Sequence, residues 1–586
     1  MPRPFIFTGS RLTIGIDERY RIREVLTEPN RSVNHAADTP LRVGLMVDGQ
    51  LSWLDGPEWT REFLQNGEVR FEHSASKVFI VAKNCLGKDE AFYRTFTIHN
   101  PDDFTRKVTM FWYHRLEINE SDIGITAMYR PDLDATVHYK GGSVFCFSAR
   151  SETGGIDHWT CGLAGFGGLE GTWRDAEDGL LHGNPIAQGS ADSTIGVDVL
   201  VPARGESVVS HRIAIMDFPH DPGVTILHET PCSTESDPDL AFLRAHCLAN
   251  GAIIASFDSE ILETNRATYK YCWFRDGALV SRALARQGNV EVGESFLEFA
   301  SHQKVPYLQK FTARGDVGAS WHPWIRDGKF ETPIQPDETA LVLVAAEEVQ
   351  RAGGYLASFL STSGVEIVAY LERAIQPNGL PSAGYDLWEE RYGTHTYSAA
   401  MVAAGLAAAS RLGLCDDHLA NRVRQGIVDN LFDHGLVRGL DSSGQVDQTV
   451  DASVLLLPII DPYWIAFPGM KATIDRVEEA LWVQSRVGGV ARYQGDYYFR
   501  QSELFPGNPW IICTMWLAQA RLLVFGDAER AVELYRWARQ WAMSTGAMPE
   551  QIHPESGEPL SVCPLAWSHA EVLETKRLLL EAGQEL

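Results

Sequence analysis

The chain has 586 residues, of which 45% are hydrophobic, 10% aromatic and 22% charged. This composition is typical of a globular protein with a full core, and it excludes a disordered chain, a collagen and a disulfide-stapled mini-protein. The formal net charge of −26 at pH 7 repels phosphate backbones and anionic lipids, so we expect no nucleic-acid and no membrane partner. A neutral or cationic small molecule is the better candidate.

The N-terminal segment and the cysteines indicate a cellular compartment. The segment MPRPFIFTGSRLTIGIDERY has no basic start followed by an apolar core of signal-peptide length, and no apolar run reaches about 18 residues. The nine cysteines form no CxxC pair and mostly lie in apolar stretches, which predicts buried, reduced thiols. We therefore expect a cytoplasmic protein.

Residues 1–229 are predicted to form an antiparallel β-sandwich domain. Apolar residues recur there mostly with a period of two, as in segments 77–82 and 91–98, which are rich in β-branched and aromatic residues. Turn signals such as Gly141-Gly142 follow at short intervals, which favours hairpins over a parallel sheet with crossover helices.

Residues 230–250 are assigned to a linker, because they open on the Pro-, Ser- and Asp-rich run TPCSTESDP. About eleven helical patterns then recur up to the C-terminus, among them a continuous one at 277–302. Long loops rich in Trp, Tyr, Gly and Pro separate them. Helices joined by such loops suggest helix pairs arranged in a ring, and residues 251–586 are predicted to be the catalytic domain.

A first cluster with the chemistry of a binding site lies at 269–278, directly before a strong helical pattern. It contains aromatic residues at Tyr269 and Trp273 beside the charged pair Arg275 and Asp276. Aromatic rings cover the apolar face of a pyranose, and the guanidinium and carboxylate groups each engage hydroxyls in pairs. In the alternative interpretation Asp276 is a helix N-cap and Arg275 a surface charge.

A second cluster, GYDLWEER, contains Asp386, Trp388, Glu389 and Glu390. Adjacent carboxylates beside a Trp suit a general acid, because apolar packing and a like charge raise the pKa of a Glu. The alternative is a helical capping box formed by Asp386 and Glu389, with Glu390 in solvent.

Two later clusters complete the set. Glu550 and Gln551 lie in a predicted loop, where a Glu can serve as a general base toward water or can simply be solvated. Arg492 precedes the segment GNPW, in which Asn508 before Pro predicts a helix start and Trp510 is a candidate cleft residue. Single histidines such as His395 and His569 are interpreted as structural.

Taken together and in this order, the four segments WFRD, DLWEE, GNPW and PEQ resemble glycoside hydrolase family 15, the glucoamylase-like enzymes, in their prokaryotic two-domain form. The resemblance covers most of the chain. It implies an N-terminal antiparallel β-sandwich followed by an (α/α)6 toroid, a hydrolase that acts on α-linked gluco-oligosaccharides, and no cofactor or catalytic metal.

The resemblance also implies residue roles. Glu389 matches the general acid of the family and Glu550 the general base. The substrate-binding residues implied by the matched motifs are Tyr269, Trp273, Arg275, Asp276, Trp388, Glu390, Arg492 and Trp510. In the two-carboxylate scheme the acid protonates the glycosidic oxygen while the base activates a water on the opposite face of the sugar, which releases β-glucose.

The sequence departs from the fungal pattern near the outer subsites. Gln335 and Asp337 match the Q-x-D motif of the family, but Glu331 stands near the position of a Trp that covers the acid, and the nearest tryptophans are Trp321 and Trp324. The sequence therefore leaves the linkage open between α-1,4, α-1,6 and trehalose. The alternatives to an exo-acting α-glucosidase are a trehalase, a related phosphorylase and a catalytically silent carbohydrate-binding protein.

Overall fold

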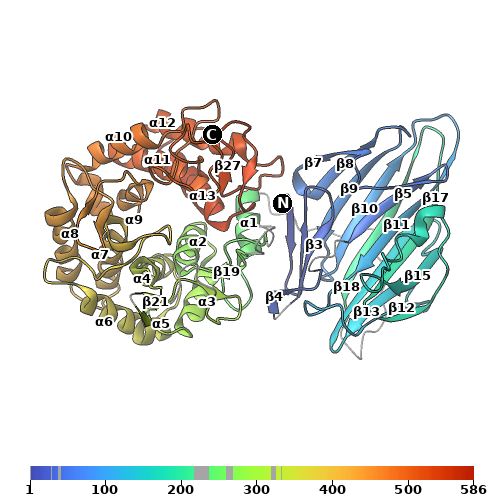
Figure 1. The fold of residues 1–586 in the computed structure, drawn as a ribbon, viewed down its shortest axis with the longest axis horizontal. Coiled ribbons are helices and arrows are strands. Elements are labelled where there is room, and N and C mark those ends of the chain that lie inside the picture. The colour runs from blue at the N-terminus through green and yellow to red at the C-terminus, as the bar shows by residue number, and fades with distance from the viewer. Residues whose placement is uncertain are drawn as a thin grey trace. The chain divides into compact units, whose positions relative to one another are not determined.

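The computed structural model of the chain describes residues 2–27, 30–36, 41–216, 237–258, 268–318, 325–326, 328–330 and 333–586. These residues form two compact units, Arg3–Ser236 and Asp237–Leu586. The first unit consists of β-strands and the second is mainly helical (Figure 1). The predicted order of a β domain followed by a helical one is therefore correct.

All paired strands of the first unit are antiparallel, and they form three sheets. The four-stranded sheet contains β1 (Phe5–Thr8), β2 (Leu12–Ile16), β3 (Ile22–Thr27) and β4 (Asn30–Asn34). The nine-stranded sheet contains, in spatial order, β16 (Ile186–Gly189), β12 (Ile125–Arg130), β13 (Ala135–Lys140), β14 (Ser143–Ser151), β18 (Glu206–Ile215), β10 (Phe92–His99), β9 (Phe79–Leu86), β8 (Glu68–His73) and β7 (Trp59–Phe63). The five-stranded sheet contains β15 (His158–Leu163), β17 (Ala191–Val201), β11 (Arg106–Arg115), β5 (Arg42–Val47) and β6 (Gln50–Trp53).

The alternation predicted from the sequence places one face of each strand in the core. In β10, Phe96 and Ile98 are fully buried, while Thr95 and Thr97, which alternate with them, are partly exposed. Large side chains such as Trp112 fill the space behind these residues. The first unit is thus built of β-sandwich-like antiparallel sheets, as the period of two indicates.

The helices of the second unit follow the predicted patterns closely. They are α1 (Pro238–His246), α2 (Phe274–Arg286), α3 (Val290–Ser301), α4 (Pro336–Arg351), α5 (Ala357–Phe359), α6 (Val365–Ala374), α7 (Thr396–Arg411), α8 (His418–Leu431), α9 (Leu457–Ile460), α10 (Met470–Leu481), α11 (Ile511–Ala520), α12 (Ala528–Trp541) and α13 (Ala566–Glu581). Short antiparallel strands lie between some of them. Three pairs are β19 (Tyr271–Cys272) with β20 (Phe311–Thr312), β21 (Ile325–Arg326) with β22 (Lys329–Phe330), and β27 (Gln551–Ile552) with β28 (Pro559–Leu560). One four-stranded sheet contains, in order, β23 (Gly384–Tyr385), β24 (Tyr392–His395), β25 (Gly439–Asp441) and β26 (Val446–Asp447).

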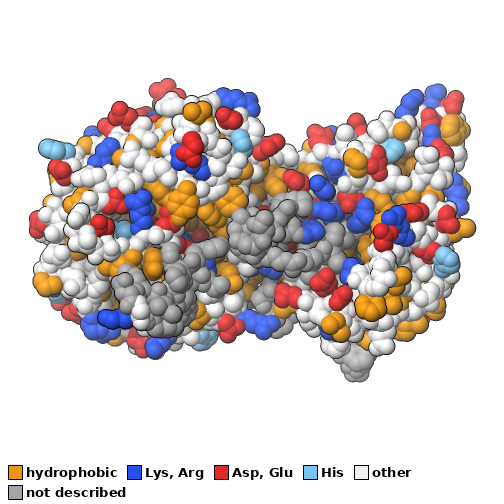
Figure 2. All heavy atoms as spheres, viewed as in Figure 1, with side chains coloured by type: hydrophobic (Ala, Val, Ile, Leu, Met, Phe, Trp, Pro, Cys, Tyr) orange, Lys and Arg blue, Asp and Glu red, His pale blue; other side chains and the backbone are white. Residues whose placement is uncertain are grey.

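Six helical elements contact one another in a closed sequence. Helix α2 contacts α4, α4 contacts α7, and α7 contacts α9, which contacts α11; α11 contacts α13, and α13 contacts α2 again. Figure 1 shows these elements around the centre of the helical unit. On the face of this unit that Figure 2 shows, acidic and basic side chains are interspersed, so the negative charge is not gathered in one patch there.

Two boundaries differ from the prediction. The assigned linker 230–250 is too long, because 238–246 form α1, which packs on α13; residues 230–236 lie outside the described part of the chain. The Asp237 carboxylate caps α1 by accepting from the amide of Asp239. The pattern at 277–302 is two helices, since the chain reverses at Gly288, whose φ of 83° is left-handed.

Seven cysteines are free thiols, namely Cys146, Cys161, Cys247, Cys272, Cys415, Cys513 and Cys563. Cys85 is disulfide-bonded, so the expectation of reduced thiols is wrong for this residue. The hydrophobic period and the cysteine spacing could not have predicted this disulfide, because such a bond depends on which residues are close in the tertiary structure.

Within the described residues, no helix has both the length and the apolar character required to cross a bilayer.

Candidate active site

A cavity of about 290 Å³ opens in the helical unit, and all ten residues predicted for the site line it. The ten are Tyr269, Trp273, Arg275, Asp276, Trp388, Glu389, Glu390, Arg492, Trp510 and Glu550. They come from segments up to 281 positions apart, which the closed packing of the helices brings to one place. The cavity has the size and the mixed aromatic and charged lining of a small-ligand site.

Glu389 lies in the turn that joins β23 to β24. Its amide donates to the carbonyl of Asp386 over 3.0 Å, and its φ of 64° lies in the left-handed region, which costs free energy in a residue other than glycine. One oxygen of Asp386 accepts from the amides of Glu390 and Arg391, while Arg438 donates to the other. The alternative of a helical capping box is therefore wrong, since Asp386 stabilises a turn and no helix follows it.

The two oxygens of Glu389 have different surroundings. Oε1 accepts a hydrogen bond of 2.6 Å from Nε1 of Trp273 and lies 3.9 Å from Nη2 of Arg275. Oε2 has no hydrogen-bond partner among the described residues, and its nearest charge is Nζ of Lys310 at 4.0 Å. One oxygen is thus held by a hydrogen bond, while the other is buried without one in the described part of the chain and faces the ammonium of Lys310.

Arg275 lies at the centre of a buried carboxylate cluster at the start of α2. Its guanidinium lies 3.1 Å from Asp276 and 3.4 Å from Glu338, and it donates to the carbonyl of Leu387 over 3.1 Å. Burial raises the pKa of Asp276 to about 6, although Arg275 opposes this shift. The alternative roles are wrong: Trp273 is the N-cap residue of α2, and Arg275 is buried.

Arg492 forms a second charged centre between two tryptophans. It donates to Glu390 over 2.9 Å and to Asp496 over 2.6 Å, and its guanidinium lies 5.1 Å from the ring centre of Trp388 and 4.8 Å from that of Trp510. Burial raises the pKa of Glu390, which Arg492 opposes. Glu390 is therefore a paired, half-buried group, and its alternative as a solvated residue is wrong.

The predicted N-cap role of Asn508 is also wrong. Helix α11 begins at Ile511 with Trp510 as its N-cap residue. The side-chain amide of Asn508 instead donates to Oε1 of Gln551 over 2.8 Å. Asn508 thus supports the residue next to Glu550.

Glu550 lies in the loop before β27 and is only 4% exposed. Its Oε1 accepts from the hydroxyl of Tyr269 over 3.2 Å, and that hydroxyl lies 2.9 Å from the hydroxyl of Tyr498. Burial raises the pKa of Glu550 to about 7. At neutral pH this carboxyl group exchanges its proton readily, so the alternative of a solvated loop Glu is wrong.

Several lining residues were not predicted from the sequence. Tyr497, Tyr498 and Trp567 line the cavity, while Lys310 packs its ammonium 4.8 Å from the ring centre of Trp273. The adjacent tyrosines in GDYYF were a usable signal, because they share the aromatic character of the predicted clusters. Trp567 lies within a helical pattern, and no aromatic or charged cluster surrounds Lys310 in the sequence. The sequence around each of them therefore does not distinguish it from an ordinary core or surface residue. Trp321, Trp324 and Glu331 lie outside the described residues.

Comparisons with known proteins point to a family of hydrolases. Residues 324–537 match the family described as Glycosyl hydrolases family 15. An uncharacterized glycosyl hydrolase of Methanocaldococcus jannaschii is 24% identical over 606 aligned residues, covering 92% of each chain. Trehalase 1 of Sulfolobus acidocaldarius is 24% identical over 351 residues, which are 55% of this chain and 58% of the trehalase.

A solved structure shares the fold. The crystal structure of a bacterial glucoamylase complexed with acarbose superposes with a TM-score of 0.72 at 15% identity, and the match covers 99% of this chain and 94% of the other. The family match, the full-length glycosyl hydrolase relative and the cavity together indicate a glycoside hydrolase that is similar to glycosyl hydrolase family 15 in sequence and to a glucoamylase in fold.

Proposed function

We propose that the protein is an inverting, exo-acting α-glucoside hydrolase that releases β-glucose from the non-reducing end of α-linked gluco-oligosaccharides. The observation that carries this proposal is the pair of carboxyl groups in one cavity, Glu389 with one oxygen held by Trp273 and Glu550 with a pKa of about 7. Two carboxyl groups around one glycosidic bond are the usual machinery of such hydrolysis.

Glu389 is the proposed general acid. Trp273 and Arg275 hold its Oε1, which fixes the orientation of a carboxyl group that lines the cavity, and this group protonates the glycosidic oxygen. Glu389 has a left-handed backbone in the turn between β23 and β24, and its side chain lines the cavity. Backbone strain of this kind is common where a reacting group must be presented.

Glu550 is the proposed general base. A base works best when its pKa lies near the working pH, and burial gives Glu550 a pKa of about 7. It removes a proton from a water that attacks the anomeric carbon opposite the leaving group. Space for this water requires the two carboxyl groups to stand about 6.5–9.5 Å apart, compared with about 5–5.5 Å in a retaining enzyme.

The remaining residues of the cavity fit one end of a sugar chain. Arg275 and Asp276 are nearly fully buried and offer paired hydrogen bonds to hydroxyls. Trp388 and Trp510, which both line the cavity, supply apolar surface for a pyranose. A cavity of about 290 Å³ with charged groups buried at its wall suits the end of an oligosaccharide better than its middle.

The fold and its relatives support the same proposal. The closed sequence of contacts from α2 through α13 and back to α2 is what an (α/α)6 toroid requires. The glucoamylase with the similar fold was solved with acarbose bound, which is consistent with a gluco-oligosaccharide substrate here. No cofactor enters this mechanism, because acid and base supply both proton transfers.

Trehalose is the alternative substrate. Trehalases of Sulfolobus acidocaldarius and of Thermoplasma acidophilum each match just over half of the chain at 24% identity. Cleavage of trehalose needs the same acid and base, so only the residues beyond the first sugar distinguish the two activities. A silent carbohydrate-binding protein is no longer an alternative, since the chain is a glycoside hydrolase.

The test is a hydrolysis panel of maltose, maltotriose, isomaltose, isomaltotriose, trehalose and soluble starch, with the anomer of released glucose followed by NMR. β-Glucose released first from one linkage supports the proposal and identifies the substrate, whereas α-glucose released first refutes the inverting roles. Glu389→Gln and Glu550→Gln should each abolish turnover. Glu555→Gln is the matched control, because Glu555 is an exposed carboxylate near the same loop.

A further inference from the structure

The loop that carries Glu550 is held by contacts from outside it. Residues 546–549, between α12 and β27, have no regular secondary structure, yet Ala547 and Met548 are fully buried. A buried backbone segment that belongs to no helix or sheet needs hydrogen-bond partners from elsewhere for its amides and carbonyls. The position of Glu550 therefore depends on whatever supplies these partners.

Three of the partners come from α13 and the residue before it. The amide of Met548 donates to Nε2 of His569 over 3.0 Å, and its carbonyl accepts from the amide of Leu565 over 2.9 Å. The carbonyl of Pro549 accepts from the hydroxyl of Ser568 over 2.8 Å. His569 is the side chain that satisfies the buried amide two residues before Glu550.

This contact decides the tautomer of His569. A backbone amide only donates, so Nε2 must accept and the ring proton must be on Nδ1. Nδ1 lies 2.8 Å from Oδ1 of Asp239, which accepts that proton, and the second oxygen of Asp239 accepts from Arg539 over 2.8 Å. Asp239 thus selects the tautomer that the loop needs.

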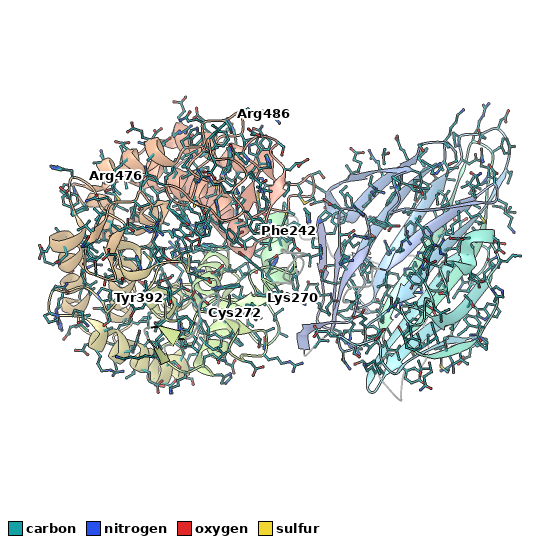
Figure 3. All side chains as sticks on the ribbon, in the orientation of Figure 1. Phe242, Lys270, Cys272, Tyr392, Arg476 and Arg486 are labelled. Atoms are coloured by element: carbon teal, nitrogen blue, oxygen red, sulfur yellow. The ribbon has the colours of Figure 1, made fainter. Side chains whose placement is uncertain are left out.

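Helix α1 supplies Asp239 and also packs on the imidazole. The ring of Phe242 stacks on that of His569 at a centroid distance of 4.7 Å and an angle of 21°. Figure 3 labels Phe242 on α1, and Figure 1 shows α1 near the start of α13, which it contacts. His569 and Asp239 are 0% and 2% exposed, and neither lines the cavity. Both residues therefore influence the site only through the loop that they hold.

We propose that Asp239 and His569 are positioning residues for the general base, holding the Met548–Glu550 loop where the carboxylate can accept a proton from the attacking water. This inference rests on the proposed role of Glu550. Misplacing a reacting group by about 1 Å can cost up to about 100-fold in rate. Binding of the first sugar depends on Arg275 and Asp276, which this loop does not carry.

The experiment compares two substitutions at His569 in the full chain, using the substrate hydrolysed fastest in the panel above. In His569→Leu, which cannot accept from Met548, we expect kcat to fall about 10- to 100-fold while KM stays within about threefold. In His569→Gln, whose amide can accept from Met548 and donate to Asp239, we expect much of kcat to return. Thr575→Val is the control: Thr575 is 1% exposed in the same helix and donates only within it, to Glu571.

An unchanged kcat in His569→Leu, an equal loss in Thr575→Val, or a loss confined to KM would overturn the inference. If His569→Leu does not fold, Asp239→Leu decides, because Leu cannot accept the proton of Nδ1 and so no longer selects the tautomer that the loop needs. A lowered kcat at unchanged KM then supports the inference, and a wild-type kcat overturns it. Glu550→Gln separates the two proposals: turnover that survives this change refutes the base itself, whereas turnover lost there but intact in His569→Leu refutes only the positioning role.

Discussion

The indole Nε1 of Trp273 donates a hydrogen bond of 2.6 Å to Oε1 of Glu389. The ring of Trp273 also lies 5.5 Å from that of Tyr269, whose hydroxyl donates to Glu550. One aromatic pair therefore contacts both proposed catalytic carboxyl groups. Its orientation couples the placement of the acid to that of the base.

Removing the Trp273 hydrogen bond should impair turnover more than stability. In Trp273→Phe a hydrogen bond to a charged or reacting group is lost, which is worth about 1.5–3 kcal/mol, so we expect kcat to fall roughly 10- to 100-fold. Steady-state kinetics on the preferred substrate measures this. Trp541→Phe is the control, because its Nε1 has no hydrogen-bond partner among the described residues; an equal effect of the two changes would contradict the prediction.

The raised pKa of Glu550 predicts the acidic limb of the pH profile. The base must be deprotonated in the free enzyme, so kcat/KM should rise with pH and level off above about 7, the pKa that burial gives Glu550. A series of kcat/KM measurements across pH, at constant ionic strength, measures this limb. A limb near the ordinary Glu value of 4.5 would show that another group controls it.

The same shift predicts a pH-dependent gain of stability in Glu550→Gln. Glu550 has a pKa of about 7 in the folded chain and an ordinary value of 4.5, so the folded state binds the proton more tightly between these values. The stabilisation that comes from protonated Glu550 in the folded state is therefore fully present below pH 4.5 and is lost as pH rises to 7. Gln cannot ionise and escapes this loss, which amounts to about 3 kcal/mol by the difference in pKa.

Thermal unfolding of Glu550→Gln and of the natural chain at pH 4.5 and pH 8 measures this gain. The difference between their melting temperatures should be larger at pH 8. An equal difference at the two values would mean that Glu550 is not desolvated as the structure indicates. Glu555→Gln should show no such trend, because that side chain is exposed.

Arg492 should matter for both stability and binding. In Arg492→Met the carboxylates of Glu390 and Asp496 lose their buried cation, and breaking such a pair costs about 3–5 kcal/mol. We expect a lower melting temperature and a higher KM, since Glu390 lines the cavity. Arg70→Met, which removes an ion pair of the 56% exposed Arg70 with Glu68, should leave both unchanged.

The sequence, read together with its resemblance to a known family, predicted two domains and ten of the residues that line the cavity. Strand alternation and helical periodicity are local properties, and each site cluster is a short contiguous segment, so both are visible without coordinates. Even so, the backbone role of Asp386 and the helix start at Trp510 were misjudged, because a cap and a turn use the same residue types.

Only the tertiary structure decided which groups interact across the chain. Glu338 and Lys310 reach the site through packing, and Asp239, in a segment taken for a linker, reaches the base loop through His569, 330 positions away. The pKa of Glu550 was decided in the same way, because desolvation depends on everything packed around a carboxyl group and not on its neighbours in sequence.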